Sequence, residues 1–91
     1  MHELYLNYLS IKDQLIVLND QFEDKAGGNI YLFWPDKLRK EFDALVKPLR
    51  KNYDEVAQKL FDNLQGKYFK IDQNRIIVII NNEIVELVEM L

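Results

Sequence analysis

The acidic residues whose spacing could support chemistry are three glutamates near the C-terminus. Glu83, Glu86 and Glu89 recur every three residues. Carboxylates grouped in this way can bind a metal ion or share general acid–base work. No histidine or cysteine accompanies them, and the positions between them are apolar, so the same spacing describes the solvent face of a helix. We therefore expect no metal and no cofactor at this segment.

The chain has few residues of the types that support other enzyme chemistry. The single histidine, His2, lies next to the terminus, and the chain has no cysteine. No Ser–His–Asp or Cys–His set can be assembled around it. The stretch Ala26-Gly27-Gly28-Asn29 lacks the spacing and the lysine of a phosphate-binding loop, and it is typical of a turn. We interpret the chain as a protein that is not an enzyme.

Basic residues that could contact nucleic acid occur in two places. The first is a run of six between residues 37 and 51, in which acidic residues lie four positions away, as in Asp43–Lys47 and Lys51–Glu55. Such pairs largely cancel the field that attracts phosphate. The second place combines aromatic and basic side chains that could stack and bind bases. It consists of Lys67, Tyr68, Lys70 and Arg75. Lysines that protect an edge strand are the alternative interpretation.

The aromatic segment 30–34 is the best candidate for a protein-binding site. Tyr31, Phe33 and Trp34 fall within five apolar residues that Pro35 ends. Aromatic side chains are enriched where interfaces bind most tightly. A small domain also needs such residues in its core. We predict that the partner surface includes this segment or the exposed side of the first helix.

Two amphipathic helices must position these residues. Apolar residues spaced by three and four predict a first helix over 3–23, and the paired glycines at 27 and 28 end it. The same spacing, from Leu38 to Leu64, predicts a second helix that has Pro35 in its first turn and that Gly66 ends. Pro48 lies within it and should kink this helix or split it in two.

Strands are predicted between and after the helices. β-branched and aromatic content favours strands over 30–34, 67–72 and 75–80, with a tight turn at Gln73-Asn74. Residues 75–80 are apolar on both faces, which indicates a central strand covered on both sides. We expect a last helix over 83–91. A third strand that turns at Asn81-Asn82 is the alternative.

Length and composition predict one α+β domain over residues 1–91, with the order α-β-α-β-β-α. The formal net charge is −3, which has the wrong sign for an obvious nucleic-acid binder. The longest apolar stretch, 76–80, is far shorter than the ~20 residues that a membrane helix needs. We therefore predict a cytoplasmic protein that does not bind a membrane.

These observations predict a small non-enzymatic protein-binding module, which means a regulator, adaptor or inhibitor of another macromolecule. Abundant lysine, asparagine and isoleucine fit an AT-rich genome, and one version of the function is a phage or mobile-element antagonist of a host system. We expect a homodimer, because the chain has more apolar stripes than one protomer is expected to cover. The alternative is a nucleic-acid-associated regulator that uses the basic–aromatic hairpin or the second helix.

Overall fold

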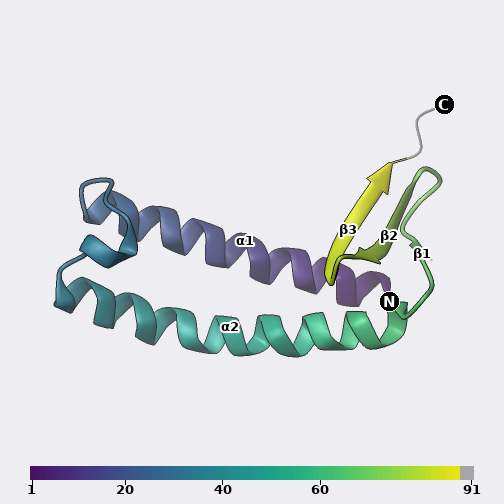
Figure 1. Ribbon diagram of the computed structural model, residues 1–91, viewed down its shortest axis with the longest axis horizontal. Coiled ribbons are helices and arrows are strands. Elements are labelled where there is room, and N and C mark those ends of the chain that lie inside the picture. The colour runs from purple at the N-terminus through teal and green to yellow at the C-terminus, as the bar shows by residue number, and fades with distance from the viewer. Residues whose placement is uncertain (89–91) are drawn as a thin grey trace.

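Two long antiparallel helices form the body of the protein, and a small sheet lies at one end of them (Figure 1). The computed structural model describes residues 1–88. Helix α1 covers His2–Lys25 and helix α2 covers Asp36–Leu64. The strands are β1 (Phe69–Lys70), β2 (Arg75–Ile80) and β3 (Glu83–Val88). The α+β class is therefore confirmed, but the predicted order is wrong, because two helices are followed by three strands.

The segment predicted as a first strand is instead the connection between the helices. Tyr31–Phe33 forms one turn of 3₁₀ helix, and Ile30 and Trp34 flank it in extended conformation. In the described part of the chain no strand lies near enough to pair with this segment, because the sheet is at the opposite end of the helix pair (Figure 1). β-branched and aromatic composition indicated a strand, but the tertiary context decided the outcome.

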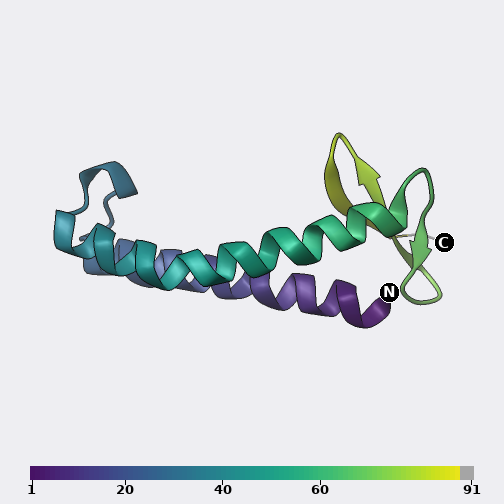
Figure 2. The same ribbon diagram turned by 90° about the horizontal axis from the view of Figure 1, so that it is seen from below.

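Helix α2 is continuous through Pro48, so of the two predicted outcomes, a kink or a split, the split does not occur. The helix bows along its length (Figure 2). Among residues 1–88, the ion pair that forms within α2 joins Asp36 to Arg39, three positions apart. The pairs expected four positions apart do not form ion pairs in this part of the chain. The acidic residues still interleave with the basic ones along the helix surface.

The predicted C-terminal helix is wrong over the described residues, where the chain forms the third strand that was the alternative. Asn81 and Asn82 have φ values of 53° and 62°. The type I′ turn of a two-residue hairpin loop requires positive φ at both central residues, and asparagine tolerates positive φ. Residue Ile80 then pairs with Glu83, and the register continues to Arg75 and Val88. The predicted position of Glu89 lies outside the described residues.

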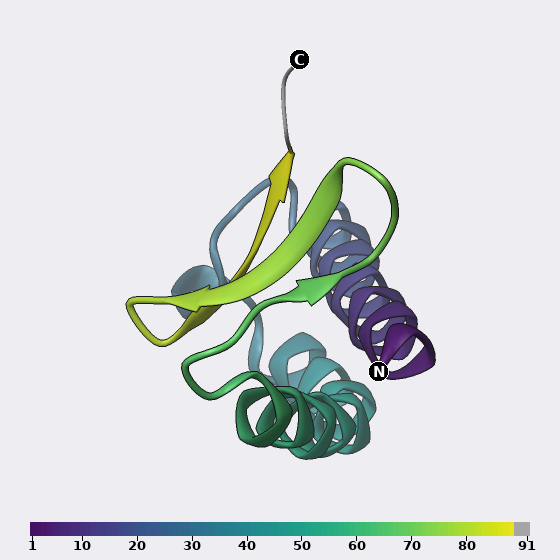
Figure 3. The same ribbon diagram turned by 90° about the vertical axis from the view of Figure 1, so that its right-hand side faces the viewer.

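The sheet has the antiparallel order β1-β2-β3 and lies across the N-terminal end of α1 and the C-terminal end of α2 (Figure 3). Its inner face carries Ile77, which is fully buried, together with Ile79 and Ile84. They complete a core built on the helices, which we call the sheet-end core. Its buried members are Tyr5, Tyr8, Ile11, Val56, Ala57, Leu60, Leu64 and Ile77. Within residues 1–88, the predicted cover on both faces of β2 is provided on the inner face only.

Candidate functional site

A second, separate core lies at the opposite end, beneath the connection between the helices. Its buried members are Phe22 of α1, Phe42 and Val46 of α2, and Trp34 of the connection. The Trp34 and Phe42 rings meet edge to face with centroids 5.1 Å apart, and the Phe22 and Phe42 centroids are 5.3 Å apart. Edge-to-face pairs add to the stability that burial alone gives. We call this group the loop-end core.

Hydrogen bonds fix the connection on this core. The Trp34 indole Nε1–H donates to the Asn29 carbonyl over 2.7 Å. The Asn29 side-chain amide in turn donates to the Ala26 carbonyl over 3.0 Å. Gly27 and Gly28 adopt φ values of 72° and 84°, which side chains with a Cβ rarely adopt. The loop is therefore held by its own residues at both of its ends.

Tyr31 provides a further attachment, to α2. Its hydroxyl donates to the Asp43 carboxylate, with oxygens 2.8 and 2.9 Å away. This hydrogen bond raises the pKa of Tyr31, because it stabilises the protonated hydroxyl next to a negative charge. The Tyr31 ring also contacts Trp34, with centroids 5.2 Å apart. Tyr31 thus supports the loop, although part of its side chain remains exposed.

The fixed loop presents three apolar side chains to solvent. Leu32 is 73 % exposed and Phe33 is 71 % exposed, and Ile30 beside them is also exposed. We call these three residues the loop-end patch. Trp34, in contrast, is only 3 % exposed. The structure therefore divides the predicted aromatic site into Phe33 at the surface, Tyr31 at its edge and Trp34 in the core.

Sequence reasoning missed Leu32 and Ile30 because it treated the segment as a strand. In a strand, Tyr31 and Phe33 would share one face and Leu32 would point to the other. The 3₁₀ turn changes this division and exposes two consecutive residues, Leu32 and Phe33. Pro35, directly after the apolar run, and the glycine pair before it were the signals of a short helix–helix connection.

The predicted nucleic-acid residues do not converge. Lys70 pairs with Ile76 and shares the outer face of the sheet with it, whereas Arg75 projects from the inner face beside Glu86. Lys67 and Tyr68 are exposed in the segment before β1. The four residues therefore do not form a single basic surface.

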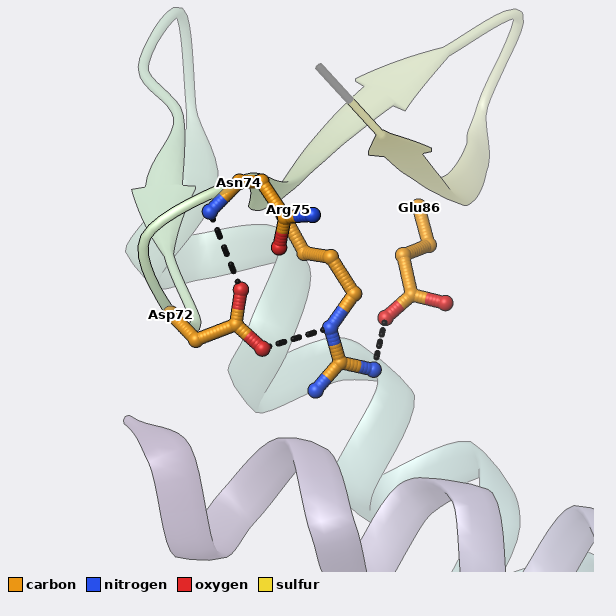
Figure 4. A network of polar contacts seen from close by, with 4 residues as sticks. All are labelled: Asp72, Asn74, Arg75 and Glu86. Atoms are coloured by element: carbon orange, nitrogen blue, oxygen red, sulfur yellow. Dashed lines mark hydrogen bonds and ion pairs between the residues drawn. The ribbon is translucent and has the colours of Figure 1, made fainter. Parts of the chain in front are cut away.

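Two carboxylates already bind Arg75 (Figure 4). Its Nε donates to Asp72 over 2.7 Å and its Nη1 donates to Glu86 over 3.2 Å. The Arg75 guanidinium, helped by the Asn74 backbone N–H, lowers the pKa of Asp72. This network closes the loop between β1 and β2, which gives Arg75 a structural role within the described chain.

The glutamates at the C-terminal end do not form a metal site over the described residues. Glu83 pairs with Ile80 and Glu86 pairs with Ile77, so their side chains lie on opposite faces of the sheet. Among residues 1–88, no group of three or more histidine, cysteine, aspartate or glutamate side chains could hold a metal ion. Glu89 lies beyond these residues.

A cleft of about 530 Å³ opens between the β2–β3 turn and the helices. Its polar side chains include Tyr53, Asp54 and Glu83. The hydroxyls of Tyr8 and Tyr53 bond to each other over 3.2 Å, and burial raises the pKa of Tyr8. The lining contains Lys12 and the carboxylates of Asp54 and Glu83, but no histidine, cysteine or serine. The tyrosine pair satisfies its own hydroxyls and belongs to the sheet-end core.

The outer side of α1, the other predicted partner surface, is less continuous. Leu6 and Val17 are exposed, and they border a shallow groove of about 660 Å³. Ser10, Asp13 and Gln14 interrupt the apolar residues of this groove. The loop-end patch therefore remains the most concentrated exposed apolar site on the helical part of the protein.

Neither a protein family nor a curated protein or solved structure shows significant similarity to this chain. No helix among residues 1–88 is long and apolar enough to cross a membrane. A functional assignment therefore depends on the physical properties of the surfaces described above.

Proposed function

We propose that this chain is a non-enzymatic protein-binding module, and that its loop-end patch inserts into an apolar pocket of another protein. The observation that carries the proposal is the exposure of Leu32 and Phe33 side by side on a hydrogen-bonded loop. Large apolar side chains exposed singly are common, but adjacent ones on a fixed loop are typical of interaction sites.

The rigidity of the loop favours binding because little conformational entropy remains to be lost. An interface loses part of its affinity in ordering loops and side chains, and a preformed loop avoids much of that cost. Trp34 and Tyr31 provide the order here, through the bonds to Asn29 and Asp43. Burial of Leu32 and Phe33 by a partner would then contribute about 1.5–3 kcal/mol for each side chain.

The position of the patch also suits docking. The molecule is 47 Å in its longest dimension, and the loop lies at the end opposite the sheet. The loop can therefore enter a recess in a partner without contact between the sheet and that partner. The sequence next to the patch carries both acidic and basic residues, including Asp24, Lys25, Asp36 and Lys37. This mixed charge suits a protein surface better than an anionic membrane, which attracts mainly basic residues.

The test compares two double variants, each of which replaces two exposed apolar side chains with serine. The first is Leu32→Ser with Phe33→Ser, and the matched control is Leu6→Ser with Val17→Ser on the outer side of α1. Each tagged variant and the wild type would capture proteins from a native lysate, followed by mass spectrometry and calorimetry with the purified partner. We expect one partner to bind the wild type and the control, and to lose at least about 100-fold in affinity for the loop variant, because two anchors are removed.

Three outcomes would contradict the proposal. In the first, both variants bind every captured protein as the wild type does. In the second, the α1 variant alone loses binding, which would place the partner surface on the helix. In the third, the wild type binds lipid vesicles in a manner that depends on Phe33 and binds no protein, which would make the patch a membrane anchor. Thermal melts of both variants serve to confirm that each remains folded.

A further inference from the structure

The cleft between the β2–β3 turn and the two helices has the size and the lining of a small-molecule site. Its volume of about 530 Å³ lies within the range of roughly 300–1,000 Å³ that is typical of ligand pockets. Its floor is apolar and aromatic. The floor consists of side chains that are buried or half-buried: Tyr8, Tyr53, Ala57, Phe61 and Ile84.

Three charged side chains surround this floor, and each comes from a different element. Lys12 extends from α1, Asp54 from α2 and Glu83 from the start of β3. Within residues 1–88, none of the three forms an ion pair, whereas two carboxylates bind Arg75 in the neighbouring hairpin. The cleft therefore presents one ammonium and two carboxylates that do not neutralise one another directly.

The aromatic floor presents ring faces rather than hydroxyls. The hydroxyls of Tyr8 and Tyr53 bond to each other over 3.2 Å. The Lys12 ammonium lies 6.0 Å from the centroid of the Tyr8 ring. Burial and the bond to Tyr53 raise the pKa of Tyr8, and the negative charge of Glu83 contributes further, so this carboxylate also lies near the ring. Ring faces of this kind attract cations as well as apolar groups.

We propose that this cleft binds a small basic amino acid of the arginine type. Such a ligand carries one carboxylate and two cationic groups on an apolar stem, which complements one ammonium and two carboxylates around an apolar floor. Its carboxylate would pair with Lys12, and its cations would pair with Asp54 and Glu83. A guanidinium suits this lining because its planar fork binds a carboxylate through two hydrogen bonds and also stacks on aromatic rings.

The charge balance of the lining narrows the choice of ligand. Two carboxylates and one ammonium give the cleft one net negative charge, which favours a ligand of net positive charge. A simple amine would leave the Lys12 ammonium without a counter-charge, and a neutral amino acid would leave one carboxylate without one. The binding should be weak, because the charged side chains are exposed and exposed ion pairs contribute little each. This inference does not depend on the loop-end patch, which lies at the other end of the protein.

A titration of the full chain with L-arginine, followed by nuclear magnetic resonance, tests the location of the site. We expect saturable changes in the amide signals around the cleft, including those of Lys12, Asp54 and Glu83. The signals of Leu32 and Phe33 should stay unchanged. Changes that do not saturate, or that lie outside the cleft, would overturn the inference.

Analogues of arginine that each lack one charge test which groups bind. Agmatine lacks the carboxylate, citrulline lacks the side-chain cation and Nα-acetylarginine lacks the charged α-amino group. Each should bind about 2- to 5-fold more weakly than arginine, because one exposed ion pair is lost. L-Glutamate, which has net negative charge, should not bind. Equal affinity for arginine and all three analogues would contradict the proposed pairing of charges.

Substitutions of the three charged residues connect each ligand group to its partner. Lys12→Met should weaken the binding of arginine but not that of agmatine, because agmatine has no carboxylate for the lysine. Asp54→Asn and Glu83→Gln should weaken the binding of both ligands. Matched controls are Lys40→Met and Asp20→Asn, which remove exposed charges of the same types near the loop end.

The variants should remain folded, because all the substituted side chains are exposed, and thermal melts check this. The inference is wrong if the three cleft variants bind arginine as the wild type does. It is also wrong if the two control variants weaken binding as much as the cleft variants, since that result would show attraction by overall charge alone.

Discussion

At the loop end of the helix pair, a small aromatic core holds a short connection whose outward side chains are apolar and exposed. At the sheet end, a larger core holds a hairpin whose outward face is also apolar. The two ends differ in what fixes the exposed residues. Side-chain bonds from Trp34, Asn29 and Tyr31 fix the loop, whereas backbone pairing fixes the sheet. A protruding loop suits a recess in another protein, whereas the inner face of the sheet closes the larger core.

The sheet end can be examined with two neighbouring residues of β2. Ile77 is fully buried on the inner face and Val78 lies on the outer face. Ile77→Asp would bury an unpaired carboxylate, and we expect the variant to lose its cooperative thermal transition. Val78→Asp should keep a transition close to that of the wild type at low concentration. Similar loss in both variants would show that the two faces of β2 are equally covered.

Two neighbouring residues distinguish core from surface at the loop end. Trp34→Ala should lower the free energy of unfolding by about 3–5 kcal/mol, because it leaves a cavity among Phe22, Phe42 and Val46. Phe33→Ala should change it by less than about 0.5 kcal/mol. Urea denaturation followed by circular dichroism provides both values. A large effect of Phe33→Ala with a small effect of Trp34→Ala would reverse our assignment of the two rings.

The conformation of the loop can be tested at Gly28. Its φ of 84° is unfavourable for any L-residue, and no atom lies within 4 Å of the place that a Cβ would occupy. Gly28→Ala should therefore cost about 1–2 kcal/mol through backbone conformation alone. A semisynthetic chain with D-alanine at this position should be as stable as the wild type or more so. Equal destabilisation by both enantiomers would show that the loop has a different conformation.

A smaller effect is expected from pH at the sheet end. Burial, and then the bond to Tyr53, raises the pKa of Tyr8 above its ordinary value of 10.0. Above that pH the unfolded chain loses the Tyr8 proton more readily than the folded chain, so the stability contributed by this group falls as pH rises. Melting temperatures between pH 8 and about 11 should therefore decrease less for Tyr8→Phe than for the wild type. The exposed Tyr68→Phe control should follow the wild type.

Much of the helical part of the fold could be predicted from local sequence. The three-and-four spacing of Tyr8, Ile11 and Leu15 gave the first helix its correct face, and the glycine pair gave its end. The continuous second helix could not be predicted from Pro48, because a missing backbone bond costs less than the loss of the surrounding contacts of Val46 and Val56.

The strands show where local sequence was insufficient. Residues 30–34 have the composition of a strand, but a strand needs a neighbour, and the sequence does not say how far away the sheet lies. For residues 83–88, a helical period of glutamates competed with the preference of Asn81 and Asn82 for positive φ, and the turn decided the outcome. The exposure of Leu32 also depends on the position of the connection far from the sheet, so the candidate site could be predicted only in part.

The environment of the single tryptophan tests this account most directly. Trp34 is the only tryptophan in the chain, and it lies in the loop-end core. We predict blue-shifted emission and weak quenching by iodide in the native protein, both unchanged in Phe33→Ala. Native emission that matches that of the urea-unfolded chain would contradict the burial of Trp34 in the loop-end core.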